Sequence, residues 1–251
     1  MYRNYVFVTV ALLAAIAASA FAFGSLVRSF SCPSGSTFPN GVAYLSNTVY
    51  IDTNTPDMCW ETNTTGSLIR SFSSPTTGTM GTAVGSIGGT LYRWVVSYSP
   101  QVIYRCVATT GSVVNSFAAP GTYPYGVAFR DSSYIYYTES GTMQSVFLMH
   151  PTTGSIYASY ALGFDPNDLA YDPAGYLWIV DSARYVRKCT LTGSTVDSFS
   201  VSSYGYPAGC GFGGNYVWVG INAPLHSILV FTTSGTSVTP ASLGKVKTLF
   251  R

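Results

Sequence analysis

Gly66-Ser-Leu-Ile-Arg-Ser-Phe72 is the best-formed example of a short segment that recurs six times along this 251-residue chain. Each copy places a small Gly-Ser or Gly-Thr step before a run in which polar and apolar residues alternate. Successive copies are separated by about 42, 45, 43, 39 and 42 residues, which is the repeat length of a four-stranded propeller blade. The other copies begin at Gly24, Gly111, Gly154, Gly193 and, more weakly, Gly235.

Three further strand signals follow one another between consecutive copies, always in the same order. The first contains small residues, as in Gly126-Val-Ala-Phe129, and suits inner strands that crowd around an axis. The second is aromatic and β-branched, as in Tyr134-Ile-Tyr-Tyr137, and favours a half-buried sheet. The third is exemplified by Val146-Phe-Leu-Met149 and runs into a Thr-Thr-Gly-Ser turn. The aromatic residues are therefore expected in the core between neighbouring blades.

The number of copies predicts how the ring closes. The Gly-Ser strand occurs six times, but the three-strand set occurs only five times, and Pro240 interrupts the region after the last set. We therefore predict an all-β propeller of five four-stranded blades, in which the N-terminal strand at Leu26 to Phe30 completes the last blade. Six blades is the alternative count.

The two ends of the chain lie outside the repeat. Residues 1–22 carry Arg3, an apolar stretch from Val6 to Ala18, and small residues at Ala20 and Ala22, the pattern of a cleaved secretory signal peptide. The alternative is a single membrane anchor, although the apolar run is short for a span. We expect a propeller over 23–238, a basic tail over 239–251, and a secreted, periplasmic or cell-surface protein without membrane insertion after cleavage.

Charge and cysteine content narrow the function classes. Charged residues make up only 9% of the chain and the formal net charge is +2, so no basic footprint for nucleic acid is present. Of the five cysteines, Cys106 and Cys189 fall at core positions of their repeats, and Cys32 with Cys210 is the one pair that we would test for a disulfide. The odd number leaves a thiol for pairing between chains, so an oligomer is possible.

Carboxylates are the only candidates for a metal site, and we identify no catalytic residue. Asp52, Glu139 and Asp181 each end the second strand of a blade, where they could bind a calcium-like divalent cation. The alternative, which we favour, is that they cap turns through backbone N–H groups. Asp165 with Asp168 is a weaker cation site. No other cofactor is expected.

Loops rich in proline, glycine and aromatic residues precede the inner strands and should meet at one end of the ring. Such a rim is a plausible surface for binding protein or glycan, although ordinary turn chemistry also explains these residues. The predicted rim comprises Pro39, Tyr123, Pro124, Tyr125, Phe164, Asp165, Asp168, Tyr206 and Pro207.

The segment from Asp168 to Asp181, together with the Thr-Gly-Ser strand pattern, resembles secreted bacterial propellers of the NHL and virginiamycin B lyase-like group. The resemblance implies a propeller and, in the lyase, chemistry carried by a histidine base and a bound metal. Neither His150 nor His226 has an evident funnel position. We therefore expect a non-enzymatic binding scaffold, with a metal-assisted lyase or lactonase and a structural subunit of a surface assembly as alternatives.

Overall fold

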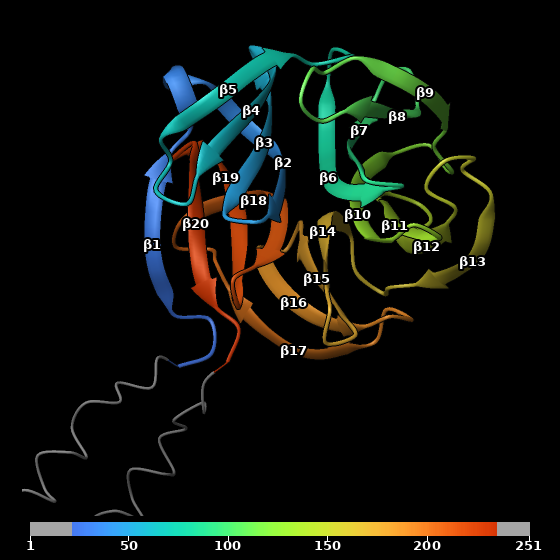
Figure 1. Ribbon diagram of the computed structural model, residues 1–251. Helices are drawn as coiled ribbons and strands as arrows, with labels where there is room; N and C mark the ends of the chain where they lie inside the picture. The colour runs from blue at the N-terminus through green and yellow to red at the C-terminus, as the bar shows by residue number, and fades with distance from the viewer. Residues whose placement is uncertain (1–21, 235–251) are drawn as a thin grey trace, which may run out of the picture.

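Five antiparallel sheets of four strands each surround a common axis in the computed structural model, which describes residues 22–234 (Figure 1). The all-β propeller and its count of five blades are confirmed, and the alternative count of six is wrong. The first four blades are β2 to β5, β6 to β9, β10 to β13, and β14 to β17, and the fifth contains β18, β19, β20 and β1.

Each blade runs from an inner strand at the axis to an outer strand at the circumference, and the 3-10 turn η1 (Pro33–Gly35) leads into the first complete blade. The strands are β1 (Leu26–Ser31), β2 (Thr37–Leu45), β3 (Thr48–Thr55), β4 (Asp57–Asn63), β5 (Leu68–Ser73), β6 (Thr79–Ile87), β7 (Thr90–Ser97), β8 (Val102–Val107), β9 (Val113–Ala118), β10 (Pro124–Asp131), β11 (Tyr134–Glu139), β12 (Ser145–Met149), β13 (Ile156–Ala161), β14 (Pro166–Asp172), β15 (Tyr176–Asp181), β16 (Tyr185–Thr190), β17 (Thr195–Ser200), β18 (Gly205–Gly213), β19 (Tyr216–Pro224) and β20 (Ser227–Thr232).

The N-terminal strand closes the ring, as the repeat count predicts. Strand β1 pairs antiparallel with β20 and becomes the outer strand of the fifth blade. The backbone N–H of Gly24 donates to the Thr232 carbonyl at 3.1 Å, and the Thr232 N–H donates to Ser25 at 3.0 Å. Figure 1 shows the two ends of the described chain side by side at this blade. Without β1 the backbone edge of β20 would be left open to other chains.

Small residues allow the inner strands to approach one another around the axis. Each of β2, β6, β10 and β14 contacts the inner strand of the next blade, and β18 contacts β2 to complete the circle. A Cβ atom on Gly41 would lie 2.7 Å from the backbone nitrogen of Thr82, and one on Gly81 would lie 2.5 Å from the Tyr125 carbonyl oxygen. Only glycine fits at these two positions.

Aromatic residues fill the space between neighbouring blades, as predicted. The Trp94 ring of the second blade stacks on Phe129 of the third at 4.9 Å between centroids. Trp218 of the fifth blade stacks in the same way on Tyr44 of the first, at 5.3 Å. Trp94 and Trp218 are almost completely buried, so these stacked pairs belong to the core.

All five cysteines are buried and unpaired, and the considered Cys32–Cys210 disulfide is therefore wrong. Cys210 lies on the inner strand β18, whereas Cys32 follows the outer strand β1 of the same sheet. Three strand spacings of about 4.8 Å separate these strands, and a disulfide needs Cα atoms about 4.4–6.8 Å apart. Cys106 and Cys189 occupy the core, as predicted.

Some expectations lie outside residues 22–234. These are most of the signal peptide over 1–22, the tail over 239–251, the end of the propeller range at 235–238, and the weak repeat copy at Gly235. Within the described range, no helix is long and apolar enough to cross a membrane.

Candidate functional site

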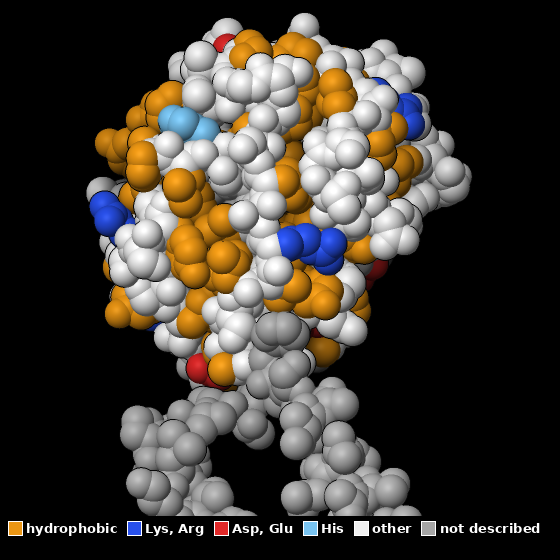
Figure 2. Space-filling model, turned by 90° about the vertical axis from the view of Figure 1, so that its left-hand side faces the viewer, with side chains coloured by type: hydrophobic (Ala, Val, Ile, Leu, Met, Phe, Trp, Pro, Cys, Tyr) orange, Lys and Arg blue, Asp and Glu red, His pale blue; other side chains and the backbone are white. Residues whose placement is uncertain are grey.

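The two ends of the ring differ in their exposed side chains. We call one end the loop face; it carries the loops that precede the inner strands and the turns that join the second and third strands of each blade. Figure 2 shows the outside of the ring around β1 and β5, where hydrophobic and uncharged polar side chains predominate and charged ones are few. The described residues include fourteen large hydrophobic side chains that are exposed, eight of them on outer strands. The other six belong to the loop face: Phe38, Tyr98, Tyr123, Met143, Tyr185 and Leu225.

A cavity of about 190 Å³ opens within the loop face, and all five blades contribute to its wall. Its lining contains three apolar side chains, two tyrosines and four asparagines, and no Asp, Glu, Lys, Arg or His. The lining residues are Phe38, Met80, Ala208, Tyr125, Tyr206, Asn40, Asn54, Asn167 and Asn222.

Hydrogen bonds between blades fix the orientation of three of the asparagine amides. Asn167 Nδ2 donates to the Pro207 carbonyl at 2.7 Å, and the Tyr206 hydroxyl donates to Asn167 Oδ1 at 3.1 Å. Asn222 Nδ2 donates to Asn40 Oδ1 at 3.1 Å, and Asn40 Nδ2 donates to a carbonyl of the second blade at 3.0 Å. The cavity wall is therefore held in place before any ligand arrives.

Two acceptors at this wall have no partner among residues 22–234. Asn54 Oδ1 and Asn222 Oδ1 are both buried and accept no hydrogen bond from the described residues. A buried acceptor without a donor is unfavourable by about 1–3 kcal/mol. A ligand that brings hydroxyl or N–H donors would remove that penalty.

The tyrosines of the wall remain neutral at physiological pH. Burial raises the pKa of both Tyr125 and Tyr206. The nearby Asp165 raises both pKa values further, whereas the hydrogen bond to Asn167 lowers that of Tyr206 without outweighing burial. The cavity consequently offers neutral hydrogen-bonding groups and aromatic surface.

The predicted rim residues occupy three kinds of position. Tyr125 and Tyr206 line the cavity, and Tyr123 is exposed beside Tyr98, with ring centroids 6.1 Å apart. Their placement makes these aromatic residues the part of the predicted rim that a ligand can reach.

Two further residues of the predicted rim, Phe164 and Asp165, contact residues from neighbouring turns and strands. The guanidinium of Arg187 lies 4.5 Å from the centre of the Phe164 ring. Asp165 accepts hydrogen bonds from the Ser140 hydroxyl and from the Gly141 N–H, the latter at 3.0 Å.

Four predicted rim residues are buried and form no part of the rim surface. Pro39, Pro124 and Pro207 lie within the first three residues of the inner strands β2, β10 and β18, and Asp168 is completely enclosed. Their burial follows from the tight packing of the inner strands, which the loop composition did not indicate.

The three carboxylates considered for a metal do not come together. Gly41 pairs with Asp52 and Asp168 pairs with Val180, so Asp52 corresponds in register to Val180. Asp181 and Glu139 lie one position further along their strands. Because side chains alternate across a strand, this one-residue offset turns Asp52 to the other face of its sheet. Among residues 22–234, no group of three or more His, Cys, Asp or Glu side chains is arranged to hold a metal ion.

Glu139 and Asp181 have partners of their own. Glu139 accepts from the backbone N–H groups of Thr122, Tyr123 and Met143, each at 3.2 Å. Asp181 accepts from Arg187 Nε at 2.5 Å and from the Tyr185 N–H at 2.8 Å. The contacts with backbone N–H groups are those of turn-capping carboxylates, and Asp181 also forms an ion pair with Arg187.

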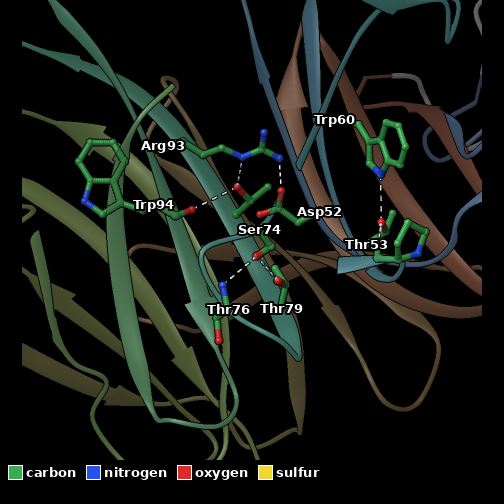
Figure 3. A network of polar contacts seen from close by, with 10 residues as sticks. Asp52, Thr53, Trp60, Ser74, Thr76, Thr79, Arg93 and Trp94 are labelled. Atoms are coloured by element: carbon green, nitrogen blue, oxygen red, sulfur yellow. Dashed lines mark hydrogen bonds and ion pairs between the residues drawn. The ribbon is translucent and has the colours of Figure 1, made fainter. Parts of the chain in front are cut away.

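Asp52 pairs with Arg93 across the first and second blades, in the network drawn in Figure 3. Both side chains have 0% exposure. Arg93 Nε also donates to Thr82 Oγ1 at 3.0 Å, and that hydroxyl donates to the Trp94 carbonyl at 3.1 Å. Burial acts against the charge of Arg93, but Asp52 and other neighbours outweigh it and raise the Arg93 pKa. Asp52, Arg93, Thr82 and Trp94 join two blades, and none of these four residues lines the cavity.

Sequence reasoning missed the asparagines and Arg93. The signal for Asn40 and Asn167 was present, because each follows a proline in a loop at the start of an inner strand. Arg93 stands where the other blades carry Val49, Ile135, Leu177 and Val217, so a strand-by-strand alignment would have marked it as a charge at a core position.

Both histidines lie outside the cavity lining. His150 Nδ1 accepts from the N–H groups of Thr152 and Thr153, each at 3.3 Å, and so holds a hairpin turn. The His226 ring packs edge to face against Phe38, with centroids 5.3 Å apart.

No protein-family model and no curated protein sequence matches this chain. Among solved structures, it is similar to the glutaminyl cyclase of Myxococcus xanthus, with a TM-score of 0.68 and 9% identity over 86% of this chain and 98% of that chain. It is also similar to the WD40 propeller domain of Doa1, with a TM-score of 0.53 and 14% identity over 77% of this chain and 63% of that one. Virginiamycin B lyase from Staphylococcus aureus gives a TM-score of 0.51 and 20% identity over 85% and 74% of the two chains. At these identities the comparisons show a shared β-propeller fold.

Proposed function

We propose that this protein is a non-enzymatic binding propeller that holds one neutral, hydroxyl-rich ring, such as the terminal sugar of a glycan, in the cavity of its loop face. The observation that carries the proposal is the cavity wall itself: four asparagines and two neutral tyrosines, with two acceptors left unsatisfied. A sugar ring combines hydroxyl donors for those acceptors with C–H faces for aromatic side chains.

The size of the cavity supports a single ring. A cavity of about 150 Å³ can hold a molecule of the size of benzene. The cavity of about 190 Å³ therefore has room for one six-membered ring with small substituents. A longer chain would continue outward over exposed aromatic residues such as Tyr98 and Tyr123.

The composition of the wall favours binding over catalysis. General acid–base chemistry needs a group that titrates near the working pH and reaches the reacting atoms. The cavity wall holds neither a carboxylate nor a histidine, and the pKa values of both its tyrosines are raised. Asp52, Glu139 and Asp181 already have close partners, so the metal-assisted lyase gains no support from them.

The proposal places this binding face outside the cytoplasm, because the first 22 residues have the pattern of a signal peptide. Burial of all five unpaired thiols is compatible with an oxidising compartment, since enclosed thiols react slowly.

A glycan array probed with the purified full-length chain tests the proposal. We expect binding to arrays that display neutral terminal sugars, and weaker binding to sialylated or sulfated ones. Asn222→Ala should weaken binding about 10–100-fold, the equivalent of about 1.4–2.8 kcal/mol.

Asn115→Ala is the matched control, because Asn115 Nδ2 also donates to a carbonyl at 2.7 Å but lies on the outer strand β9. Equal losses in both variants, or binding only to immobilised peptides, would contradict the glycan proposal.

A further inference from the structure

The axis of the ring contains one departure from the repeat. The first residue of the small-residue segment is aspartate in the fourth blade and glycine in the other four. The residues at this level are Gly41, Gly81, Gly126, Asp168 and Gly209.

The Asp168 side chain lies completely enclosed among the inner strands. Its Oδ2 accepts from the Cys210 N–H of the fifth blade at 2.7 Å. The N–H groups of Leu169, of Val42 in the first blade and of Val127 in the third are also directed at this carboxyl group. Burial raises the pKa of Asp168 well above its usual range, and these amides oppose that rise. Backbone N–H groups from four blades thus surround this side chain, and the one from Cys210 forms a hydrogen bond with it.

The other carboxyl oxygen fills space that glycine leaves empty. Cβ atoms on Gly126 and Gly81 would lie 2.6 Å and 3.0 Å from Asp168 Oδ1. Asp168 Oδ1 itself has no hydrogen-bond partner among residues 22–234. The site therefore supplies a donor for one carboxyl oxygen and free volume for the other.

From this arrangement we infer that the axis of the propeller is a binding site for a carboxyl group, and that the chain fills this site with its own Asp168. The inner strands supply the amides, and Gly81 and Gly126 supply the room. A narrow channel of about 40 Å³, lined by Val42, Thr82, Val127, Leu169 and Cys210, adjoins the site. We expect a small monocarboxylate to reach the axis through this channel once the Asp168 side chain is removed.

The experiment uses the full chain with Asp168→Gly, a substitution that gives the fourth blade the residue found in the other blades. Thermal melts are recorded with rising formate or acetate, and with sodium chloride at equal ionic strength. We expect the carboxylates to raise the melting temperature with the logarithm of their concentration, by about 2–4 °C once they exceed their Kd several-fold. Wild type and Asp168→Asn, whose axial sites are already filled, should show no response beyond that to chloride.

Equal shifts in all three proteins would overturn the inference, because they would indicate a general salt effect. No shift in Asp168→Gly would overturn it as well. If Asp168→Gly does not fold in chloride, refolding from urea provides the second readout. Recovery of folded protein in formate alone would support the axial site, and recovery in neither salt would refute it.

Discussion

The buried pair of Arg93 and Asp52 gives the strongest prediction about stability. At the same register, the fourth blade carries Leu177 and Val180. The test therefore compares Arg93→Leu, Asp52→Val and the double variant with the wild type. Each replacement is a residue that this fold already accepts at the equivalent position of another blade.

The expected magnitudes follow from the complete burial of both groups. Removing one member leaves a buried charge without its partner, which costs about 3–5 kcal/mol. For a domain of this size, that loss lowers the melting temperature by about 6–20 °C. Replacing both members with apolar residues of suitable size is commonly neutral or stabilising by about 1–4 kcal/mol. The double variant should therefore be at least as stable as the wild type.

Urea unfolding and thermal melts of the four proteins provide the free energies for a double-mutant cycle. We expect a coupling energy of at least about 3 kcal/mol between the two positions. Additive losses, with the double variant the least stable protein, would refute the reasoning. That result would mean that Arg93 and Asp52 stabilise the blade interface through separate contacts, such as those of Arg93 with Thr82 and the aromatic rings of Tyr50 and Phe72.

Three further predictions follow from the seam, the thiols and the axial carboxyl group. Deleting residues 24–30 removes most of β1 and should lower the melting temperature by more than about 10 °C; an unchanged value would contradict closure by the N-terminal strand. Burial raises the pKa of Cys32 and Cys106 to about 12 and that of Cys189 to about 11, so no thiol should react with a thiol-specific dye near neutral pH until urea unfolds the chain, and early labelling would disprove the enclosed positions. Burial raises the folded-state pKa of Asp168 above its unfolded value of about 3.9, so the folded state binds this proton more tightly. The stability of the wild type relative to Asp168→Asn should therefore be greatest below about pH 4 and fall as the pH rises through the folded-state pKa. Urea unfolding of both proteins across this pH range measures the difference, and a difference that does not change with pH would contradict the reasoning.

Much of the fold could be predicted because a propeller repeats its chemistry. Each Gly-Ser strand, such as Gly66 to Phe72, is a local signal that needs no partner to be recognised. The mismatch between six such strands and five sets indicated the seam between β1 and β20.

The cavity was harder to predict because it depends on the convergence of distant residues. Asn54 and Asn222 are separated in sequence but line the same cavity, and neither belongs to a repeated motif. The prediction that Asp52 lies with Glu139 and Asp181 was wrong for a different reason. The ends of the second strands look alike in sequence, and only the pairing register shows that Asp52 lies one residue earlier on its strand than Asp181 does on its own. Tyr125 and Tyr206 could be predicted, because their loops precede inner strands that meet at the axis.

A crystal structure of the protein with the tightest-binding array glycan tests the central claim most directly. We predict the terminal sugar within the loop-face cavity, with hydroxyl groups about 2.7–2.8 Å from Asn54 Oδ1 and Asn222 Oδ1. A sugar bound on the outer strands or at the opposite end of the ring, with the loop-face cavity containing only water, would contradict it.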